Sequence, residues 1–125
     1  MNGVLPATEA MIERFYVGRS DMRPGMTTKA VVALQRGEPV GLAGGYLDTT
    51  NGRAVLFADM TDDLRSNKRL MLRFLRSALA AARSFGVVVH SLADPDIEGA
   101  DRLLEHLGGR FAGSGIYEFD AEGRA

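Results

Sequence analysis

The sequence predicts an α/β (α+β) fold: a mixed, mostly antiparallel sheet flanked by helices. Three observations lead to this prediction. Residues 28–60 contain β-rich runs separated by tight turn signals, which is typical of an antiparallel meander. Residues 62–86 have the apolar periodicity of a long amphipathic helix. Residues 87–120 then alternate strand, helix and strand patterns, which requires a crossover and therefore one parallel strand pair.

Length and composition indicate a single domain spanning residues 1–125. The chain has 46% hydrophobic residues, 15 Lys and Arg against 16 Asp and Glu, two well-separated histidines and no cysteine. This near-neutral balance favours neither nucleic acid nor a membrane surface as a partner. The lack of cysteine excludes disulfides, thiolate catalysis and Cys-based zinc sites, and we expect no metal centre. No apolar run reaches the roughly 18 residues of a spanning helix, so we expect a cytoplasmic protein.

Residues 1–27 are predicted to form a short helix followed by a loop. The stretch "PATEAMIERFYV" (residues 6–17) contains i, i+4 apolar pairs, and its leading proline suits the first turn of a helix. A Pro-Gly turn signal lies in the loop that follows.

Residues 28–60 are predicted to form the three-stranded meander. Asn51-Gly52 is a strong hairpin signal, and the apolar run "AVLFADM" after it indicates a strand covered on both faces. Gly41, Gly44 and Gly45 within "VGLAGG" predict a bulge, or a place where a ligand or another element approaches the backbone closely.

Residues 62–86 are predicted to form one long helix that ends at Gly86. We expect Asp62 or Asp63 to cap it. Its polar face carries a row of arginines, either a solvated face or a surface for an acidic partner, and the neutral net charge favours solvation. The row comprises Arg65, Arg69, Arg73, Arg76 and Arg83.

The last part of the chain is predicted to form a strand, a helix and a strand over residues 87–120, followed by a flexible tail over residues 121–125. "VVVHSL" is a buried strand pattern, and "ADPDIEGADRLLEHLGG" is an amphipathic helix with Asp94 as its N-cap. Residues 110–120 predict a final strand pair turning at residues 113–115.

This order of elements resembles the GNAT superfamily of acyl-CoA N-acyltransferases. The likeness covers residues 28–120 and is clearest in "SALAAARSFGVVVHSL" and "ADRLLEHLGGRFAGSGIYEFD". It implies a GNAT-like sheet with an abbreviated N-terminus, since one short helix replaces the usual strand and two helices. It also implies acetyl-CoA or another acyl-CoA as cofactor.

The family's phosphate-binding Arg/Gln-x-x-Gly-x-Gly/Ala loop corresponds here to residues 66–71, where both glycine positions are occupied by Arg69 and Met71. The resemblance implies that the pantetheine pairs with the backbone at Met60 and Thr61, and that the pyrophosphate meets Asn67, Lys68 and Arg69. Two further family positions are changed: the pantetheine-binding Asn corresponds to Ile97, and the general-acid Tyr to Leu104.

Asp59 and His90 are the candidate catalytic bases. Asp59 ends the buried strand, and its alternative is simple solvation. His90 has a side chain suited to proton transfer near neutral pH, and its alternative is a hydrogen-bonded histidine in the core or at a sheet edge. Tyr117 is the only tyrosine expected near the site as a substitute acid, although an ordinary aromatic packing role is favoured.

Two functions therefore remain open. The first is a divergent acyl-CoA N-acyltransferase acting on a small-molecule or protein amine. The alternative is a non-catalytic GNAT-fold binding or structural protein, similar to stripped-down relatives among phage and accessory-genome products. In that case the ligand would be a protein partner or a second copy of the chain, bound at the arginine row or an exposed edge strand.

Overall fold

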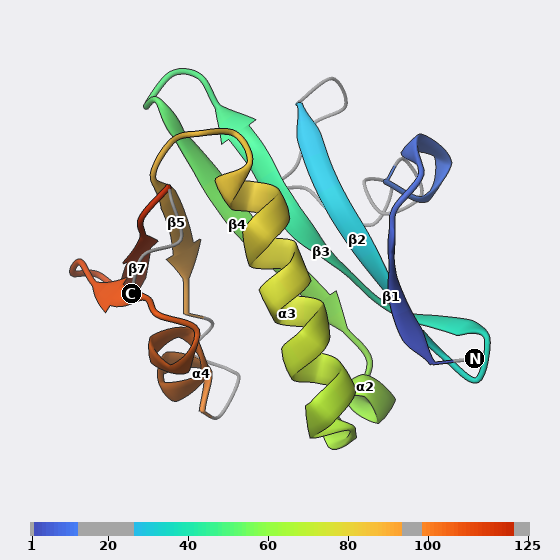
Figure 1. Cartoon of the computed structure of the whole chain (residues 1–125). Coiled ribbons are helices and arrows are strands. Elements are labelled where there is room, and N and C mark those ends of the chain that lie inside the picture. Colours follow the sequence, from blue (N-terminus) through green and yellow to red (C-terminus); the bar gives the residue numbers. More distant parts are fainter. Residues whose placement is uncertain (1, 13–26, 94–98, 122–125) are drawn as a thin grey trace.

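A computed structural model describes residues 2–12, 27–93 and 99–121, and it confirms the predicted mixed α+β class (Figure 1). The described strands are β1 (Gly3–Pro6), β2 (Thr28–Gln35), β3 (Glu38–Asp48), β4 (Arg53–Met60), β5 (Val89–Leu92), β6 (Arg110–Phe111) and β7 (Ile116–Phe119). The helices with described bounds are α2 (Asp62–Ser66), α3 (Lys68–Arg83) and α4 (Ala100–His106).

All seven described strands form one sheet in the order β1-β2-β3-β4-β5-β7-β6. Every neighbouring pair is antiparallel except β4 and β5, which are parallel as predicted. Helices α2 and α3 connect these two strands, and α3 lies across one face of the sheet (Figure 1). The sheet therefore has a single parallel step at its centre, between two antiparallel halves.

The prediction for the N-terminus is wrong at its start. Gly3–Pro6 forms strand β1, which pairs with β2, so the chain does have a first strand. Pro6 ends this edge strand, where a missing N–H is tolerated, and does not begin a helix. Residues 9–12 are helical, and Thr8 caps them by accepting from the N–H of Met11 at 3.3 Å. The rest of the expected helix lies outside the described residues.

The meander of β2, β3 and β4 is confirmed, and the glycines of β3 mark close packing. A Cβ on Gly45 would lie 2.6 Å from Cβ of Ala82 in α3, and one on Gly44 would lie 2.1 Å from the carbonyl oxygen of Lys29. The register between β2 and β3 also shifts between Ala33 and Leu34, as in a β-bulge. Other elements of the chain thus make the close approach at Gly44 and Gly45.

The single long helix expected over residues 62–86 is broken at Asn67 into α2 and α3. The cap prediction was also wrong, because Thr61 caps α2 and Asn67 caps α3, while Asp62 and Asp63 lie in the first turn of α2. Gly86 adopts a positive φ of 76° just after the end of α3, in agreement with its expected role in stopping the helix.

The C-terminal part follows the predicted order. The predicted Asp94 cap and Ile97 lie outside the described residues, and the described part of the helix begins at Ala100. The turn between β6 and β7 carries positive φ at Gly113, Ser114 and Gly115, which explains the glycines there. The expected flexible tail is described only at its first residue.

Two clusters of buried side chains cover the two faces of the sheet. The larger packs α3, α4 and the sheet together and includes Phe74, Phe119 and Leu64, all of them fully buried. The smaller, on the opposite face, contains Ala30, Val32, Leu42 and Phe57, with Ala7 and Ile12 packed against it. Among the described residues, no helix has the length and apolar character needed to cross a bilayer.

Candidate functional site

The two parallel strands at the centre of the sheet separate soon after they meet. Their register consists of Ala54 with Val89 and Val55 with His90, whereas β4 continues to Met60. Figure 1 shows the two strands diverging toward their C-terminal ends. Among the described strands, the second half of β4 therefore has a partner on one side only, which is β3.

The backbone groups that face this gap follow from strand alternation. The N–H of Ala54 donates to the carbonyl of Val88 on the β5 side at 2.9 Å, and the N–H of Thr61 donates to Val40 on the β3 side at 3.0 Å. Successive residues of a strand direct their N–H and C=O groups to opposite sides. Ala58 and Met60 therefore direct theirs toward the gap, beyond the last β4–β5 pair.

In the corner after β4 (residues 61–69), two of the expected cofactor-binding residues, Thr61 and Asn67, cap helices. The Thr61 hydroxyl accepts from the N–H of Leu64 at 3.3 Å, and Oδ1 of Asn67 accepts from the N–H of Leu70, also at 3.3 Å. The N–H of Thr61 is likewise engaged by Val40. The Thr61 hydroxyl, the Thr61 N–H and Oδ1 of Asn67 could therefore bind a ligand only if one of these hydrogen bonds were broken.

The next two expected residues remain accessible. Lys68 and Arg69 are exposed, and their N–H groups belong to the first turn of α3, where helix geometry provides no acceptor. Met71 is half-buried and packs against the larger core cluster. The exposed corner therefore presents two basic side chains and the positive end of the α3 dipole.

Asp59 lies on the face of the sheet opposite α3, next to a hollow of about 440 Å³. Its side chain is exposed and makes no hydrogen bond or ion pair with another described residue. The hollow is otherwise mostly apolar, and its described lining consists of Met11, Val32, Pro39, Val40, Gly41, Leu42, Asp59, Met60 and Thr61. The sequence did not predict that residues of β2 and β3 line this hollow, because their position beside Asp59 depends on strand register.

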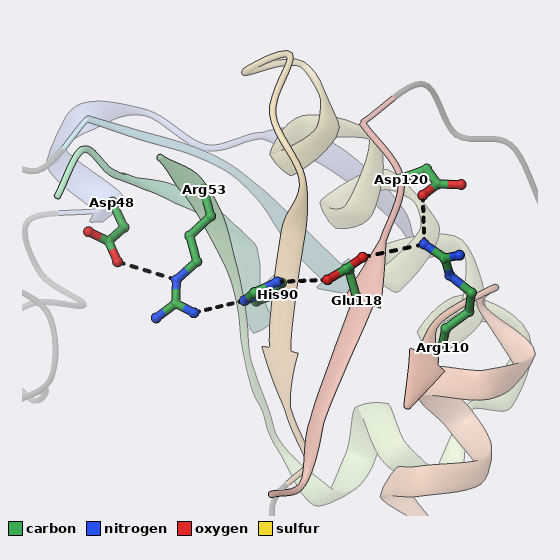
Figure 2. A network of polar contacts seen from close by, with 6 residues as sticks. All are labelled: Asp48, Arg53, His90, Arg110, Glu118 and Asp120. Atoms are coloured by element: carbon green, nitrogen blue, oxygen red, sulfur yellow. Dashed lines mark hydrogen bonds and ion pairs between the residues drawn. The ribbon is translucent and has the colours of Figure 1, made fainter. Parts of the chain in front are cut away.

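His90 lies in a different environment, within a chain of polar contacts that crosses the sheet (Figure 2). Its Nδ1 lies 2.8 Å from Nη1 of Arg53, and its Nε2 lies 3.2 Å from Oε2 of Glu118. Arg53 also pairs with Asp48, and Arg110 with Glu118. A side-chain hydrogen bond from Asn51 lowers the pKa of Asp48 at one end of this chain.

The structure does not bring the two candidate bases together. His90 is paired with Val55, which precedes Asp59 by four residues on the same strand, or roughly 13 Å at about 3.3 Å per residue. Both ring nitrogens of His90 are already engaged by Arg53 and Glu118. Of the two candidate bases, Asp59 is the one whose side chain has no partner among the described residues.

Tyr117 on β7 and Leu104 on α4 both belong to the larger core cluster. The Tyr117 hydroxyl donates to Oε1 of Glu105 at 3.3 Å. Burial of the phenol raises the pKa of Tyr117, and the negative charges of Asp101 and Glu105 raise it further. These contacts give Tyr117 a packing role within the described structure.

Some arginines of the row on α2 and α3 make contacts within the fold. Arg65 pairs with Asp62, and Nε of Arg83 donates to the carbonyl of Asp120 at 2.9 Å. Arg73 and Arg76 are exposed, with no ion-pair partner among the described residues. This agrees with the favoured interpretation of a mainly solvated face.

No group of three or more His, Asp or Glu side chains suited to a metal ion occurs within residues 2–12, 27–93 and 99–121. Comparison of the chain with protein-family models, curated proteins and solved structures found no match. The case for a function therefore depends on the geometry of this site.

Proposed function

We propose that the protein binds an acyl-CoA along the free edge of β4 and transfers the acyl group to an amine. One observation carries the proposal: the pairing of β4 with β5 ends at Val55 and His90, while β4 continues to Met60 beside the start of α2. An unpaired strand edge offers alternating donors and acceptors to an extended ligand. The amide-containing pantetheine arm of CoA is such a ligand.

Lys68 and Arg69 extend this interpretation to the phosphate end of the cofactor. Both side chains are exposed at the first turn of α3, which is separated from the end of β4 by the short helix α2. Basic side chains and free N–H groups at a helix start favour phosphate. Without glycines, the phosphates would be held by side-chain charge as well as by the backbone, which suits a divergent member of the GNAT-like class.

The reaction needs few groups. The amine nitrogen attacks the thioester carbonyl, a carbon–nitrogen bond forms, the carbon–sulfur bond breaks, and the proton lost by the amine balances the departing thiolate as a thiol. Asp59 is the accessible carboxylate next to the free edge and can accept the amine proton through a water. The N–H groups of Ala58 and Met60 can polarise the carbonyl.

Calorimetric titration with acetyl-CoA tests the proposal. We expect micromolar binding in the wild type that weakens about 10- to 100-fold in Lys68→Ala and Arg69→Ala, since a charge-assisted hydrogen bond contributes about 1.5–3 kcal/mol. Arg76→Ala is the matched control, because Arg76 is an exposed arginine two turns further along α3. No heat at millimolar acetyl-CoA would exclude the acyltransferase.

A non-catalytic binding protein is the second candidate, and exposed apolar side chains at one end of the sheet favour it. Leu92 is 67% exposed and Phe111 is 65% exposed. If this end contacts a second copy of the chain, the molar mass from light scattering should rise with concentration, and Leu92→Ser with Phe111→Ser should abolish the rise. A constant monomer mass would exclude self-association.

A further inference from the structure

The hollow beside Asp59 is formed by a continuous row of side chains across three strands. Leu42 is the register partner of Val32 on one side and of Asp59 on the other. Directly opposed residues of antiparallel strands have Cβ atoms about 4.5–5.5 Å apart and share a face. An exposed carboxylate therefore sits at the end of an aliphatic row, and Met11 of the helical segment also lines the hollow.

Within residues 2–12, 27–93 and 99–121, no basic side chain pairs with the Asp59 carboxylate. No lysine, arginine or histidine is among the described lining residues, and Asp59 has no ion-pair partner in the described part of the chain. Some other carboxylates are paired with arginine, such as Asp48 with Arg53 and Glu118 with Arg110. A carboxylate bordering an apolar concavity is complementary to a cation attached to an apolar group.

The volume of the hollow restricts the ligand further. About 440 Å³ lies within the range of small-molecule sites and can hold a compact ligand. Apart from Asp59 and Thr61 the described lining is apolar, and Asp59 contributes its only charge. A ligand with a single positive group and a short apolar body matches both properties.

We propose that this hollow binds a primary ammonium group carried on a compact aliphatic body, and that such an amine is the acceptor substrate. The identification as acceptor rests on the proposed function. Asp59 and Met60 are consecutive on β4, so the carboxylate that holds the ammonium directly precedes the N–H that faces the gap. An amine on Asp59 would thus lie next to a thioester bound along the edge.

The test uses ¹⁵N-labelled full-length protein titrated with n-hexylammonium, hexan-1-ol and methylammonium, without any CoA compound. We expect hexylammonium to shift the amide signals of Leu42, Asp59 and Met60 and to saturate at millimolar concentration. The alcohol lacks the charge and methylammonium lacks the apolar body, so each should bind at least about tenfold more weakly.

Asp59→Asn should weaken hexylammonium binding about tenfold or more, whereas Asp63→Asn, which removes an exposed carboxylate four residues away, should not. The amide spectrum of each variant reports its folding, and the ligand series on the wild type does not depend on any variant. Equal binding of amine and alcohol, unchanged binding in Asp59→Asn, or the absence of shifts at these amides would overturn the inference. Because no CoA is present, this result is independent of the acetyl-CoA titration.

Discussion

Nη1 of Arg53 lies 2.8 Å from Nδ1 of His90. A guanidinium can only donate, so Nδ1 must be the acceptor and carry no proton. The proton of the neutral ring then belongs to Nε2, which lies 3.2 Å from Oε2 of Glu118 and can donate to it. The chain of contacts in Figure 2 therefore specifies one tautomer.

We expect ¹⁵N NMR of the histidine side chains at neutral pH to show His90 in the Nε2–H form. His106 is exposed on α4, and no hydrogen bond to its ring is found among the described residues, so it provides the internal comparison. An Arg53→Met variant should release the preference and move His90 toward the pattern of His106. A proton on Nδ1 in the wild type would show that Arg53 does not bind the ring as described.

Gly45 should tolerate no side chain, because an added Cβ would lie 2.6 Å from Cβ and 2.8 Å from Cα of Ala82. Overpacking of this kind costs about 1–3 kcal/mol, so Gly45→Ala should lower the free energy of unfolding by that amount in urea denaturation. Gly3→Ala is the control, since a Cβ there meets nothing within 4 Å. Equal stability of the two variants would contradict the close packing of α3 on β3.

Asn67→Ala should cost about 1 kcal/mol of unfolding free energy, because the side chain caps α3 through the N–H of Leu70. Asn67→Asp preserves the acceptor and should retain most of the stability. If Asn67→Ala is as stable as the wild type but weakens acetyl-CoA binding, the residue contacts the ligand and does not serve as a cap. Denaturation and calorimetry on the same variants separate the two roles.

Tyr117 should make the fold sensitive to alkaline pH. Its folded-state pKa is raised by burial and by Asp101 and Glu105, so its contribution is fully present below the unfolded pKa of about 10 and is lost as the pH rises above it. The urea midpoint of the wild type should fall between about pH 9 and 11. Tyr117→Phe should flatten this dependence, and an equally steep fall in that variant would assign it to other groups.

The parts of the fold that local chemistry determines could be predicted from the sequence. Asn51-Gly52 gave the β3–β4 hairpin, and the positive φ of Gly86 agrees with the expected helix end. Strand β1 was missed because four residues carry too little alternation to register as a strand. The break at Asn67 was missed because the apolar periodicity runs through it from Leu64 to Leu70.

The caps and the site could be predicted only in part. Thr61, Asp62, Asp63 and Asn67 all belong to the residue types that cap helices, and only backbone angles decide which of them does so. The accessibility of Asp59 followed from its place at the end of a strand. The engagement of His90 by Arg53 and Glu118 depends on pairing between residues far apart in the sequence, which no local pattern contains.

Amide hydrogen exchange on addition of acetyl-CoA tests the central claim most directly. If the cofactor pairs with the free edge of β4, exchange at Ala58 and Met60 should slow. Exchange at Phe57 and Asp59, whose N–H groups face β3, should change little. Unchanged exchange at Ala58 and Met60 in the presence of saturating acetyl-CoA would contradict the account.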